Sequence, residues 1–223
     1  MERGYTFVLP GIDSAGLATG NIVHGLERGG VETAVKVEDW TTGSPALMLV
    51  HLRNEGRNRS KAREIAGRIV RYQRQHPGKP VNMVGFSGGG SMICYVLEEL
   101  PPGHRVDSVV LLAPAISPGY PVRNLLSKTR QGIWNFYSPL DIPVSVVGTT
   151  LAGTMDGKYT ASAGAIGFEE HESHAELLSG HSLMPQLHQV AFKPAMIRAG
   201  NLGGHFGPTF TRFVQVYVAP LLR

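Results

Sequence analysis

The sequence of 223 residues has a single cysteine and no long apolar run, and each of these absences excludes a structural feature. Because Cys94 stands alone, no disulfide can form within the chain and no cysteine-rich zinc site can be assembled. No stretch of about 18 consecutive apolar residues occurs, so we expect no transmembrane helix. The first residues lead almost directly into a strand pattern, without the charged segment and apolar core of a signal peptide, which favours a cytoplasmic location. A chain already trimmed of a leader would look the same.

Neither sign of charge dominates the sequence, which has 21 basic residues (Lys and Arg) and 17 acidic ones (Asp and Glu). Many of the basic residues lie between positions 53 and 74, where apolar residues such as Ile65 and Ile69 recur at helical spacing. The pattern predicts a surface helix with a solvated basic face, capped by Ser60. A phosphate or anionic-membrane contact is the alternative. The helix lacks interleaved aromatic residues and any nucleic-acid motif, so we expect no nucleic-acid partner.

The composition is that of a globular protein, with 42% hydrophobic and 17% charged residues. Glycine and proline are plentiful, at 28 and 15 residues, but they follow no period and mark many separate turns. The length suits one domain over residues 1–223.

Apolar runs alternate with helical patterns along the chain. Strands are predicted at Tyr5–Leu9, Glu32–Trp40, Val81–Gly85, Val106–Ala113, Gly132–Tyr137 and Ala195–Ala199. Helices are predicted at Leu17–Arg28, Ser60 to the residues before Pro77, Ser91–Leu100, Val122–Lys128 and Phe210–Leu222, with a start near Val144–Val147. Ala46–Leu52 fits a strand or a buried connection, and Thr149–Gly167 reads as a loop. The alternation predicts an α/β fold with a mostly parallel central sheet and helices on both faces.

The most informative stretch is Gly85-Phe86-Ser87-Gly88-Gly89, a Gly-x-Ser-x-Gly motif between a predicted strand and a predicted helix. On a turn this tight, a side chain two residues before or after the serine would collide with a neighbouring element. Gly85 and Gly89 remove those side chains, so the hydroxyl of Ser87 can stand clear as a nucleophile. A serine in an ordinary tight turn is the alternative interpretation.

A serine hydroxyl needs a base within hydrogen-bond reach, and the base needs an orienting acid. His205, between glycines in a loop that we expect to be mobile and exposed, is the candidate base, and Asp141, in a Ser-Pro-Leu-Asp turn, is the candidate acid. Each follows a predicted strand, and the carboxyl ends of parallel strands meet at one edge of a sheet. Asp156 is the rival acid. A solvated loop histidine and a turn aspartate are the alternative interpretations.

Acyl transfer also needs donors aimed at the developing oxyanion. The backbone N–H of Gly88, directly after the serine, is one candidate. The N–H of Ile12 is the other, because Gly11 lets the loop after the first strand approach closely.

Four histidines between positions 171 and 188 raise the question of a metal site. They are His171, His174, His181 and His188, and no His-Glu-x-x-His signature occurs among them. We therefore expect histidines of the surface or of a substrate cleft, with no metal and no cofactor.

The order Ser87, Asp141, His205, together with the glycine-flanked turn, resembles the α/β-hydrolase superfamily, and the resemblance covers most of the chain. Leu9–Ile12 corresponds to that family's oxyanion turn, and Tyr137–Asp141 to its acid turn after the seventh strand. The resemblance implies a nucleophile Ser87, an acid Asp141 and a base His205.

Four departures accompany the resemblance. Pro10 replaces the usual histidine before Gly11, and Phe86 replaces the histidine often found before the nucleophile. The first two strands of the full fold are absent from the pattern, since Tyr5–Leu9 already matches the third. The stretch after the sixth strand is too short for a large lid. Together they indicate a minimal member with an open cleft.

The expected function is a cofactor-free serine hydrolase that cleaves small-molecule carboxylic esters, of short or medium acyl chain, through an acyl-enzyme. Thioesterase, amidase or acyltransferase chemistry would use the same residues, and a non-catalytic binding protein of the same fold is a further alternative. The sequence does not determine the natural substrate or the oligomeric state.

Overall fold

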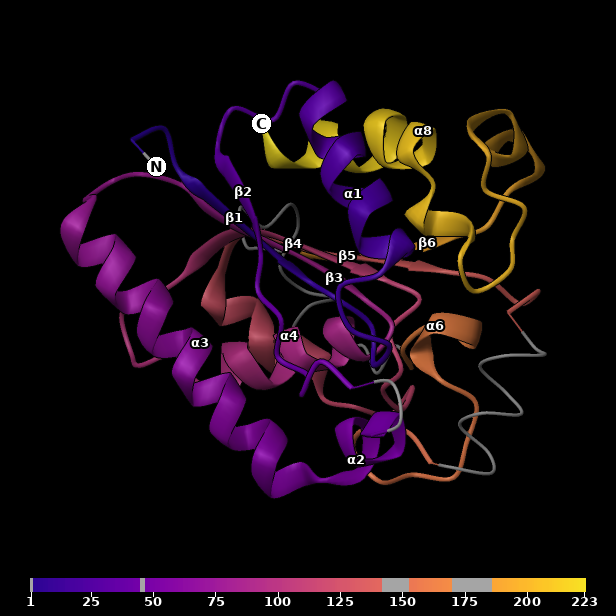
Figure 1. The fold of residues 1–223 in the computed structure, drawn as a ribbon, viewed down its shortest axis with the longest axis horizontal. Coiled ribbons are helices and arrows are strands. Elements are labelled where there is room, and N and C mark those ends of the chain that lie inside the picture. Colours follow the sequence, from indigo (N-terminus) through magenta and orange to yellow (C-terminus); the bar gives the residue numbers. More distant parts are fainter. Residues whose placement is uncertain (1, 45–46, 142–152, 170–185) are drawn as a thin grey trace, which may run out of the picture.

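The structure is a computed structural model that describes residues 2–44, 47–141, 153–169 and 186–223 (Figure 1). Its centre is a six-stranded sheet in the order β2-β1-β3-β4-β5-β6, and every neighbouring pair of strands is parallel. The strands are β1 Tyr5–Leu9, β2 Ala34–Val37, β3 Val81–Phe86, β4 Val106–Leu112, β5 Thr129–Tyr137 and β6 Gln186–Ala191. The predicted α/β fold with a parallel sheet is confirmed.

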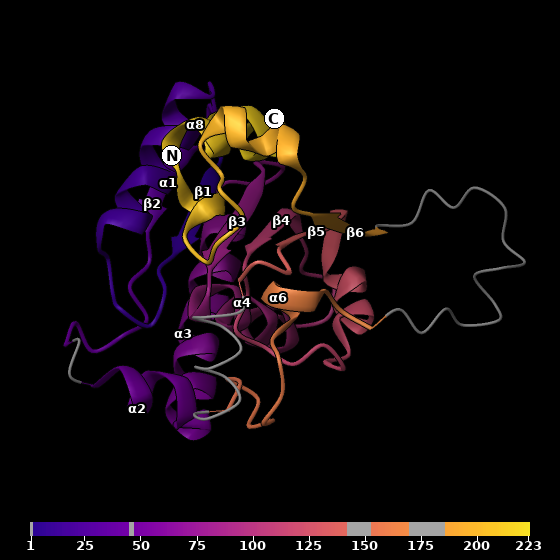
Figure 2. The same cartoon turned by 90° about the vertical axis from the view of Figure 1, so that its right-hand side faces the viewer.

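Helices cover both faces of this sheet (Figures 1 and 2). The main ones are α1 Leu17–Arg28, α2 Met48–Arg53, α3 Glu55–Gln75, α4 Gly88–Glu99 and the short α6 Ala163–Ile166. A C-terminal helical segment consists of α8 Thr211–Phe213, a π-helical turn at Val214–Val218 and a 3-10 turn at Ala219–Leu222. Helix α1 packs with this segment on one face of the sheet, while α3 and α4 pack together on the other.

The two-sided covering explains the continuous apolar runs in the central strands. In β4, Val109 and Leu111 belong to the core beneath α3 and α4, whereas Val110 and Leu112 belong to the core beneath α1 and the C-terminal segment. Successive residues of a strand point to opposite faces, so both sets must be apolar when both faces are covered.

The predicted cap of the basic helix is wrong. Helix α3 begins at Glu55, and the side chain of Asn54 accepts a hydrogen bond from the N–H of Arg57 at 3.0 Å. Ser60 lies inside the helix. Most of the ambiguous segment Ala46–Leu52 is helix α2. A short apolar run carries no period that separates a helix from a strand. One residue of α2, His51, contacts the carbonyl of Ile12 in the loop after β1.

The predicted last strand is also wrong. Pro194–Ala199 is a 3-10 helix, and the sixth strand is β6, which ends at Ala191, before the predicted strand would begin. Strand β6 lies at the edge of the sheet and all but its first residue are half-buried, so its sequence Gln-Leu-His-Gln-Val-Ala lacks an apolar run. The helix α6 lies within the predicted loop Thr149–Gly167. The predicted helix start at Val144–Val147 falls outside the described residues.

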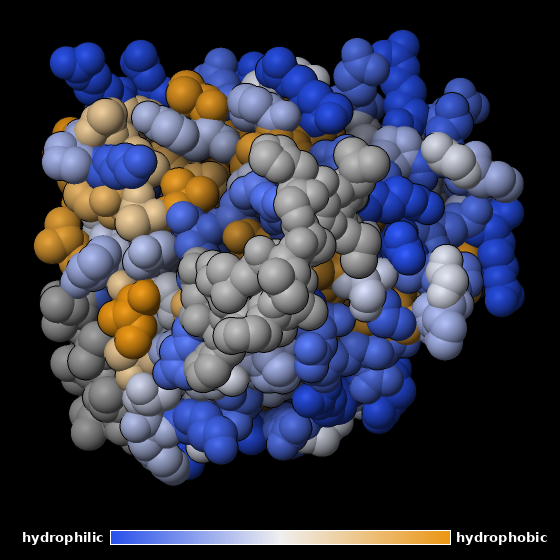
Figure 3. Space-filling view, turned by 180° about the vertical axis from the view of Figure 1, so that it is seen from behind, coloured by the Kyte–Doolittle hydropathy of each residue, from blue (hydrophilic) through white to orange (hydrophobic). Residues whose placement is uncertain are grey.

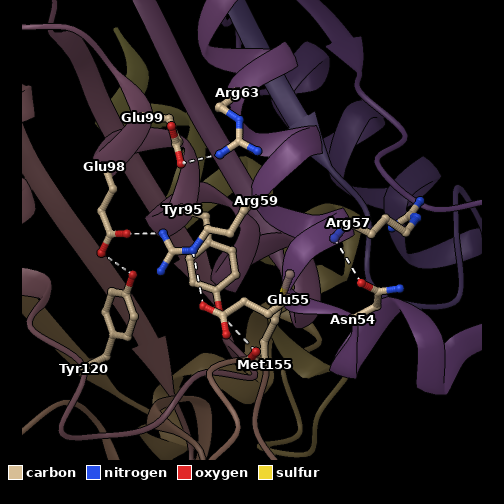
Figure 4. Close-up of polar contacts among 10 residues, drawn as sticks. All are labelled: Asn54, Glu55, Arg57, Arg59, Arg63, Tyr95, Glu98, Glu99, Tyr120 and Met155. Carbon is tan, nitrogen blue, oxygen red and sulfur yellow. Dashed lines mark hydrogen bonds and ion pairs between the residues drawn. The ribbon is translucent and has the colours of Figure 1, made fainter.

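Several basic side chains of α3 pair with nearby carboxylates, two of them on α4 (Figure 4). Arg59 donates to Glu98 of α4, Arg63 lies 3.6 Å from Glu99, and the guanidinium of Arg59 stacks 4.0 Å from the ring centroid of Tyr95. Burial raises the pKa of the Tyr95 phenol, which stays protonated and donates to a main-chain carbonyl at 3.0 Å. These contacts join α3 to α4, the helix that follows Ser87.

None of the helices in the described part of the chain combines the length and the apolar character that a membrane crossing requires.

Candidate active site

The turn at Ser87 is sharp, and this one residue connects strand β3 to helix α4. Strand β3 ends at Phe86 and helix α4 begins at Gly88, and Ser87 between them has φ +52° and ψ −118°. Residues other than glycine rarely adopt a positive φ, and such strain persists only where surrounding contacts hold it. Here the N–H of Ser87 donates to the carbonyl of Leu112 at 2.9 Å, and its own carbonyl accepts from the N–H of Ala115 at 3.1 Å.

The two flanking glycines have no room for a side chain. A Cβ at Gly85 would lie 2.6 Å from the backbone of Gly89, and a Cβ at Gly89 would lie 2.2 Å from the carbonyl oxygen of Leu9. The strand–turn–helix unit therefore packs directly against the end of β1, and the loop that follows β1 lies beside Ser87.

The structure brings Ser87, His205 and Asp141 into one hydrogen-bonded chain. The Oγ of Ser87 lies 3.0 Å from Nε2 of His205, and the Nδ1 of His205 lies 2.8 Å from Oδ2 of Asp141. Because a carboxylate can only accept, Nδ1 of His205 carries the proton and Nε2 is free to accept from the serine hydroxyl. Asp141 is 1% exposed and Ser87 8%, so the chain of contacts lies in a largely water-excluded position.

The side chain of His205 is largely buried, although the residue lies in a glycine-rich loop. Its side chain is 9% exposed, and its ring centroid lies 5.0 Å from that of Phe86 and 5.4 Å from that of Phe206. The loop is held by Asn201, whose Oδ1 accepts from the N–H of Gly203 at 2.9 Å. The loop does expose side chains, with Leu202 66% and Phe206 50% exposed, but the alternative of a solvated histidine does not hold for the His205 ring.

The rival acid Asp156 is engaged elsewhere. Its Oδ1 accepts from the N–H of Ser117 at 2.9 Å and from the hydroxyl of Thr154 at 2.6 Å, and its Oδ2 accepts from the Ser117 hydroxyl. These bonds tie the loop after β4 to the loop that carries Asp156. Of the two aspartates, Asp141 is the one in contact with His205.

The two candidate oxyanion donors lie close together. A Cβ at Gly88 would lie 3.5 Å from the backbone nitrogen of Ile12, so the loop after β1 approaches the start of α4 closely. Gly88 is the first residue of α4, where an N–H has no partner within the helix. Among the described residues, none of the main-chain hydrogen bonds uses the N–H of Ile12.

Two residues that contact this loop were not singled out from the sequence. The indole N–H of Trp40 donates to the carbonyl of Pro10 at 2.8 Å, and Nδ1 of His51 lies 2.9 Å from the carbonyl oxygen of Ile12. Trp40 is 1% exposed and His51 is fully buried. The available signal was a histidine inside an apolar run, since a buried imidazole needs hydrogen-bond partners.

A carboxylate also braces the loop after β1. The hydroxyl of Ser14 donates to Asp39 at 2.8 Å, and the hydroxyl and N–H of Thr41 donate to the same carboxylate. Burial alone would raise the pKa of Asp39, but the hydrogen bonds from Thr41 and Ser14 outweigh burial and hold this pKa below its usual value.

The structure describes one of the four clustered histidines, and the other three fall outside the described residues. The ring of His188 stacks on that of Trp134, with 4.8 Å between centroids, and burial lowers the pKa of His188. Within the described ranges no group of three or more histidine, cysteine or acidic side chains is arranged to hold a metal ion.

Comparison with known proteins assigns the fold. The family described as alpha/beta hydrolase fold matches residues 42–138, a range that includes Ser87 and ends before Asp141. The structure of LpqC, a poly(3-hydroxybutyrate) depolymerase from Bordetella parapertussis, superimposes with a TM-score of 0.50 at 17% identity, over 96% of this chain and 78% of that one. A YdeN-like hydrolase from Pectobacterium atrosepticum has a TM-score of 0.33 at 16% identity, over 85% and 78%. No curated protein sequence matches the chain.

The parallel sheet with helices on both faces, the matched family and the likeness in fold agree. The chain has the α/β-hydrolase fold.

Proposed function

We propose that this protein is a serine hydrolase that cleaves carboxylic esters through an acyl-enzyme. The observation that carries the proposal is the position of His205, whose two ring nitrogens contact Ser87 at 3.0 Å and Asp141 at 2.8 Å. A nucleophile, a base and an orienting acid joined in this order are the arrangement that activates a serine hydroxyl.

In the acylation step, Oγ of Ser87 forms a bond to the acyl carbon while its proton passes to Nε2 of His205. Asp141 keeps the proton on Nδ1 and stabilises the imidazolium that forms. The N–H groups of Gly88 and Ile12 would donate to the oxyanion, and the N-terminus of α4 adds a favourable dipole. The ester C–O bond then breaks, and His205 returns its proton to the leaving alkoxide.

In the second step a water takes the place of the alcohol. His205 removes its proton as the water oxygen bonds to the acyl carbon, and the Ser87 ester bond breaks to release the acid and restore the hydroxyl. No step requires a cofactor.

Exposed apolar side chains next to the site support an ester with an apolar part. Leu140 directly precedes Asp141, Phe206 directly follows His205, and Leu202 lies three residues before His205; they are 56%, 50% and 66% exposed. The face opposite to that of Figure 1 is largely hydrophilic, with apolar side chains gathered along one side (Figure 3). We propose a small-molecule ester of short or medium acyl chain, because the loop after β4 is too short to form a large lid.

The direct test is labelling with a fluorophosphonate probe, with the adduct located by mass spectrometry. We expect an adduct on Ser87 in the wild type and none in Ser87→Ala, which should also lose nearly all turnover of p-nitrophenyl esters. Ser127→Ala, at an exposed serine in a 3-10 turn, is the matched control and should label normally.

Two outcomes would redirect the assignment. Folded wild-type protein that takes up no probe would favour a non-catalytic binding protein of the same fold. Labelled protein that converts thioesters, amides or added alcohol acceptors faster than it hydrolyses a series of esters would favour the related acyl chemistries.

A further inference from the structure

The loop after β1 has three successive carbonyls that are each held by a hydrogen bond. The carbonyl of Pro10 accepts from Trp40 at 2.8 Å, that of Gly11 accepts from the N–H of Ser14 at 3.2 Å, and that of Ile12 contacts His51 at 2.9 Å. The N–H of Ile12 belongs to the peptide between Gly11 and Ile12. That peptide therefore cannot rotate without breaking at least one of these bonds, although glycine at its first position would otherwise allow rotation.

The protonation of the His51 ring follows from its partners. The backbone N–H of Thr42 can only donate, and it lies 3.0 Å from Nε2 of His51. Nε2 is therefore the unprotonated nitrogen, and Nδ1 carries the hydrogen that is donated to the carbonyl of Ile12. The Thr42 hydroxyl lies 2.8 Å from the same Nε2, so both nitrogens of this buried ring have partners.

The backbone of His51 is anchored in turn to the helix that follows it. The amide of Asn58 in α3, itself fully buried, donates to the carbonyl of His51 at 2.6 Å. Arg57 of the same helix donates to the carbonyl of Trp40 at 2.7 Å, and the Trp40 and His51 rings meet edge to face with 6.0 Å between centroids. Helix α3 thus positions both side chains that hold the loop.

We infer that His51 is a positioning residue for the proposed oxyanion hole, acting through the carbonyl of Ile12 to hold the N–H of Ile12 toward Ser87. The inference rests on the proposed function for its catalytic consequence, whereas the contacts themselves do not depend on it. Trp40 holds the preceding peptide, between Pro10 and Gly11, through the carbonyl of Pro10.

A donor that is displaced stabilises the transition state less but leaves ground-state binding of the ester largely intact. Deleting an oxyanion donor outright lowers kcat about 10²–10³-fold. Here the donor is displaced rather than removed, so we expect kcat to fall by about 10–10²-fold with little change in KM.

Three variants separate the two hydrogen bonds of the ring. His51→Asn places an amide N–H where Nδ1 stands and so retains the donor to Ile12, while it loses the acceptor for Thr42. His51→Gln reaches the position of Nε2 and retains an acceptor for Thr42, while it loses the donor to Ile12. His51→Leu removes both. We expect kcat to decrease in the order wild type, Asn, Gln and Leu, with Asn at least tenfold above Leu.

Two further measurements do not require turnover. Long-range 15N–1H NMR of the ring should show the Nδ1–H tautomer of His51, and the amide resonance of Ile12 should shift more in His51→Gln than in His51→Asn. A tetrahedral boronate should lose affinity in His51→Gln, whereas a ground-state ester analogue should bind both variants alike.

The outcomes are distinguishable. An Nε2–H tautomer, or equal kcat in the Asn and Gln variants, would overturn the positioning role. If kcat and KM change together across the series, His51 has a structural role alone. The same holds if the variants lower the melting temperature but kcat does not decrease in the order wild type, Asn, Gln and Leu. If His51→Leu fails to fold, the Asn and Gln pair still decides. Wild-type protein that neither labels nor turns over esters would refute the proposed function, and the tautomer and the Ile12 resonance would then still test the contacts.

Discussion

Replacement of Asp141 by asparagine tests the proposed mechanism most directly, because the two side chains have the same shape. The carboxylate is 1% exposed, and its Oδ2 lies 2.8 Å from Nδ1 of His205. Its other oxygen, Oδ1, has no hydrogen-bond partner among the described residues. If the amide nitrogen faces His205, two donors meet and the ring must move its proton to Nε2, where it can no longer accept from Ser87. If the amide oxygen faces His205, the NH₂ group takes the buried position of Oδ1, where no described residue accepts a hydrogen bond.

Either orientation also removes the negative charge that stabilises the imidazolium. Two unit charges 2.8 Å apart interact by about 6 kcal/mol at an effective dielectric constant of about 20. Each factor of ten in rate corresponds to about 1.4 kcal/mol, so the expected loss in kcat/KM is about 10⁴-fold. A loss of the same order is typical of this substitution in catalytic triads.

The assay is hydrolysis of a short-chain p-nitrophenyl ester, with circular dichroism to show that each variant is folded. Asp156→Asn is the matched control, since Asp156 binds Ser117 and Thr154 and makes no hydrogen bond to His205. It should retain kcat/KM within about tenfold, at some cost in stability. An Asp141→Asn enzyme within tenfold of the wild type, or equal losses in both variants, would refute the reasoning.

Three other predictions concern the scaffold. Gly89→Ala should lower the free energy of unfolding in urea by about 3 kcal/mol or more, because its Cβ would lie 2.2 Å from the carbonyl of Leu9. Gly20→Ala in α1, whose Cβ would have nothing within 4 Å, should raise the free energy of unfolding by about 0.5–1 kcal/mol. Equal effects of the two substitutions would contradict this explanation. Asp39→Asn should lower the melting temperature at pH 7. The pKa of Asp39 is lower in the folded state than in the unfolded state, so the carboxylate stabilises the fold above the unfolded-state pKa, and this stabilisation is lost as pH falls through the folded-state pKa. The difference in melting temperature between the variant and the wild type should therefore shrink below about pH 4. A difference in melting temperature that does not depend on pH would contradict this explanation. Tyr95→Phe should lower the free energy of unfolding by about 1–3 kcal/mol, because it leaves a buried carbonyl without its hydrogen-bond donor, while phosphonate labelling of Ser87 should be unchanged. A loss of labelling at unchanged stability would contradict this prediction.

The features that depend on neighbouring residues in the chain could be predicted from the sequence. The predicted bounds of α1 and of β1 agree with the structure residue for residue, because an amphipathic period and a short apolar run are local patterns. The turn at Ser87 could also be predicted, because its strand, its two glycines and its helix are contiguous in the sequence. The parallel sheet followed from strands that are apolar on both faces.

The features that depend on distant contacts were settled by the tertiary structure alone. Strand β6 carries no apolar run because it lies at an edge, so its pairing with β5 was not visible in the pattern. Asp141 and Asp156 both stand in turns, and the fold brings Asp141 to His205 while Ser117 and Thr154 engage Asp156. The contacts of Trp40 and His51 with the loop after β1 span 30 and 39 residues of sequence. Local patterns determine which elements form, but the partners of a buried polar group are chosen by packing, which joins residues that no spacing in the chain relates.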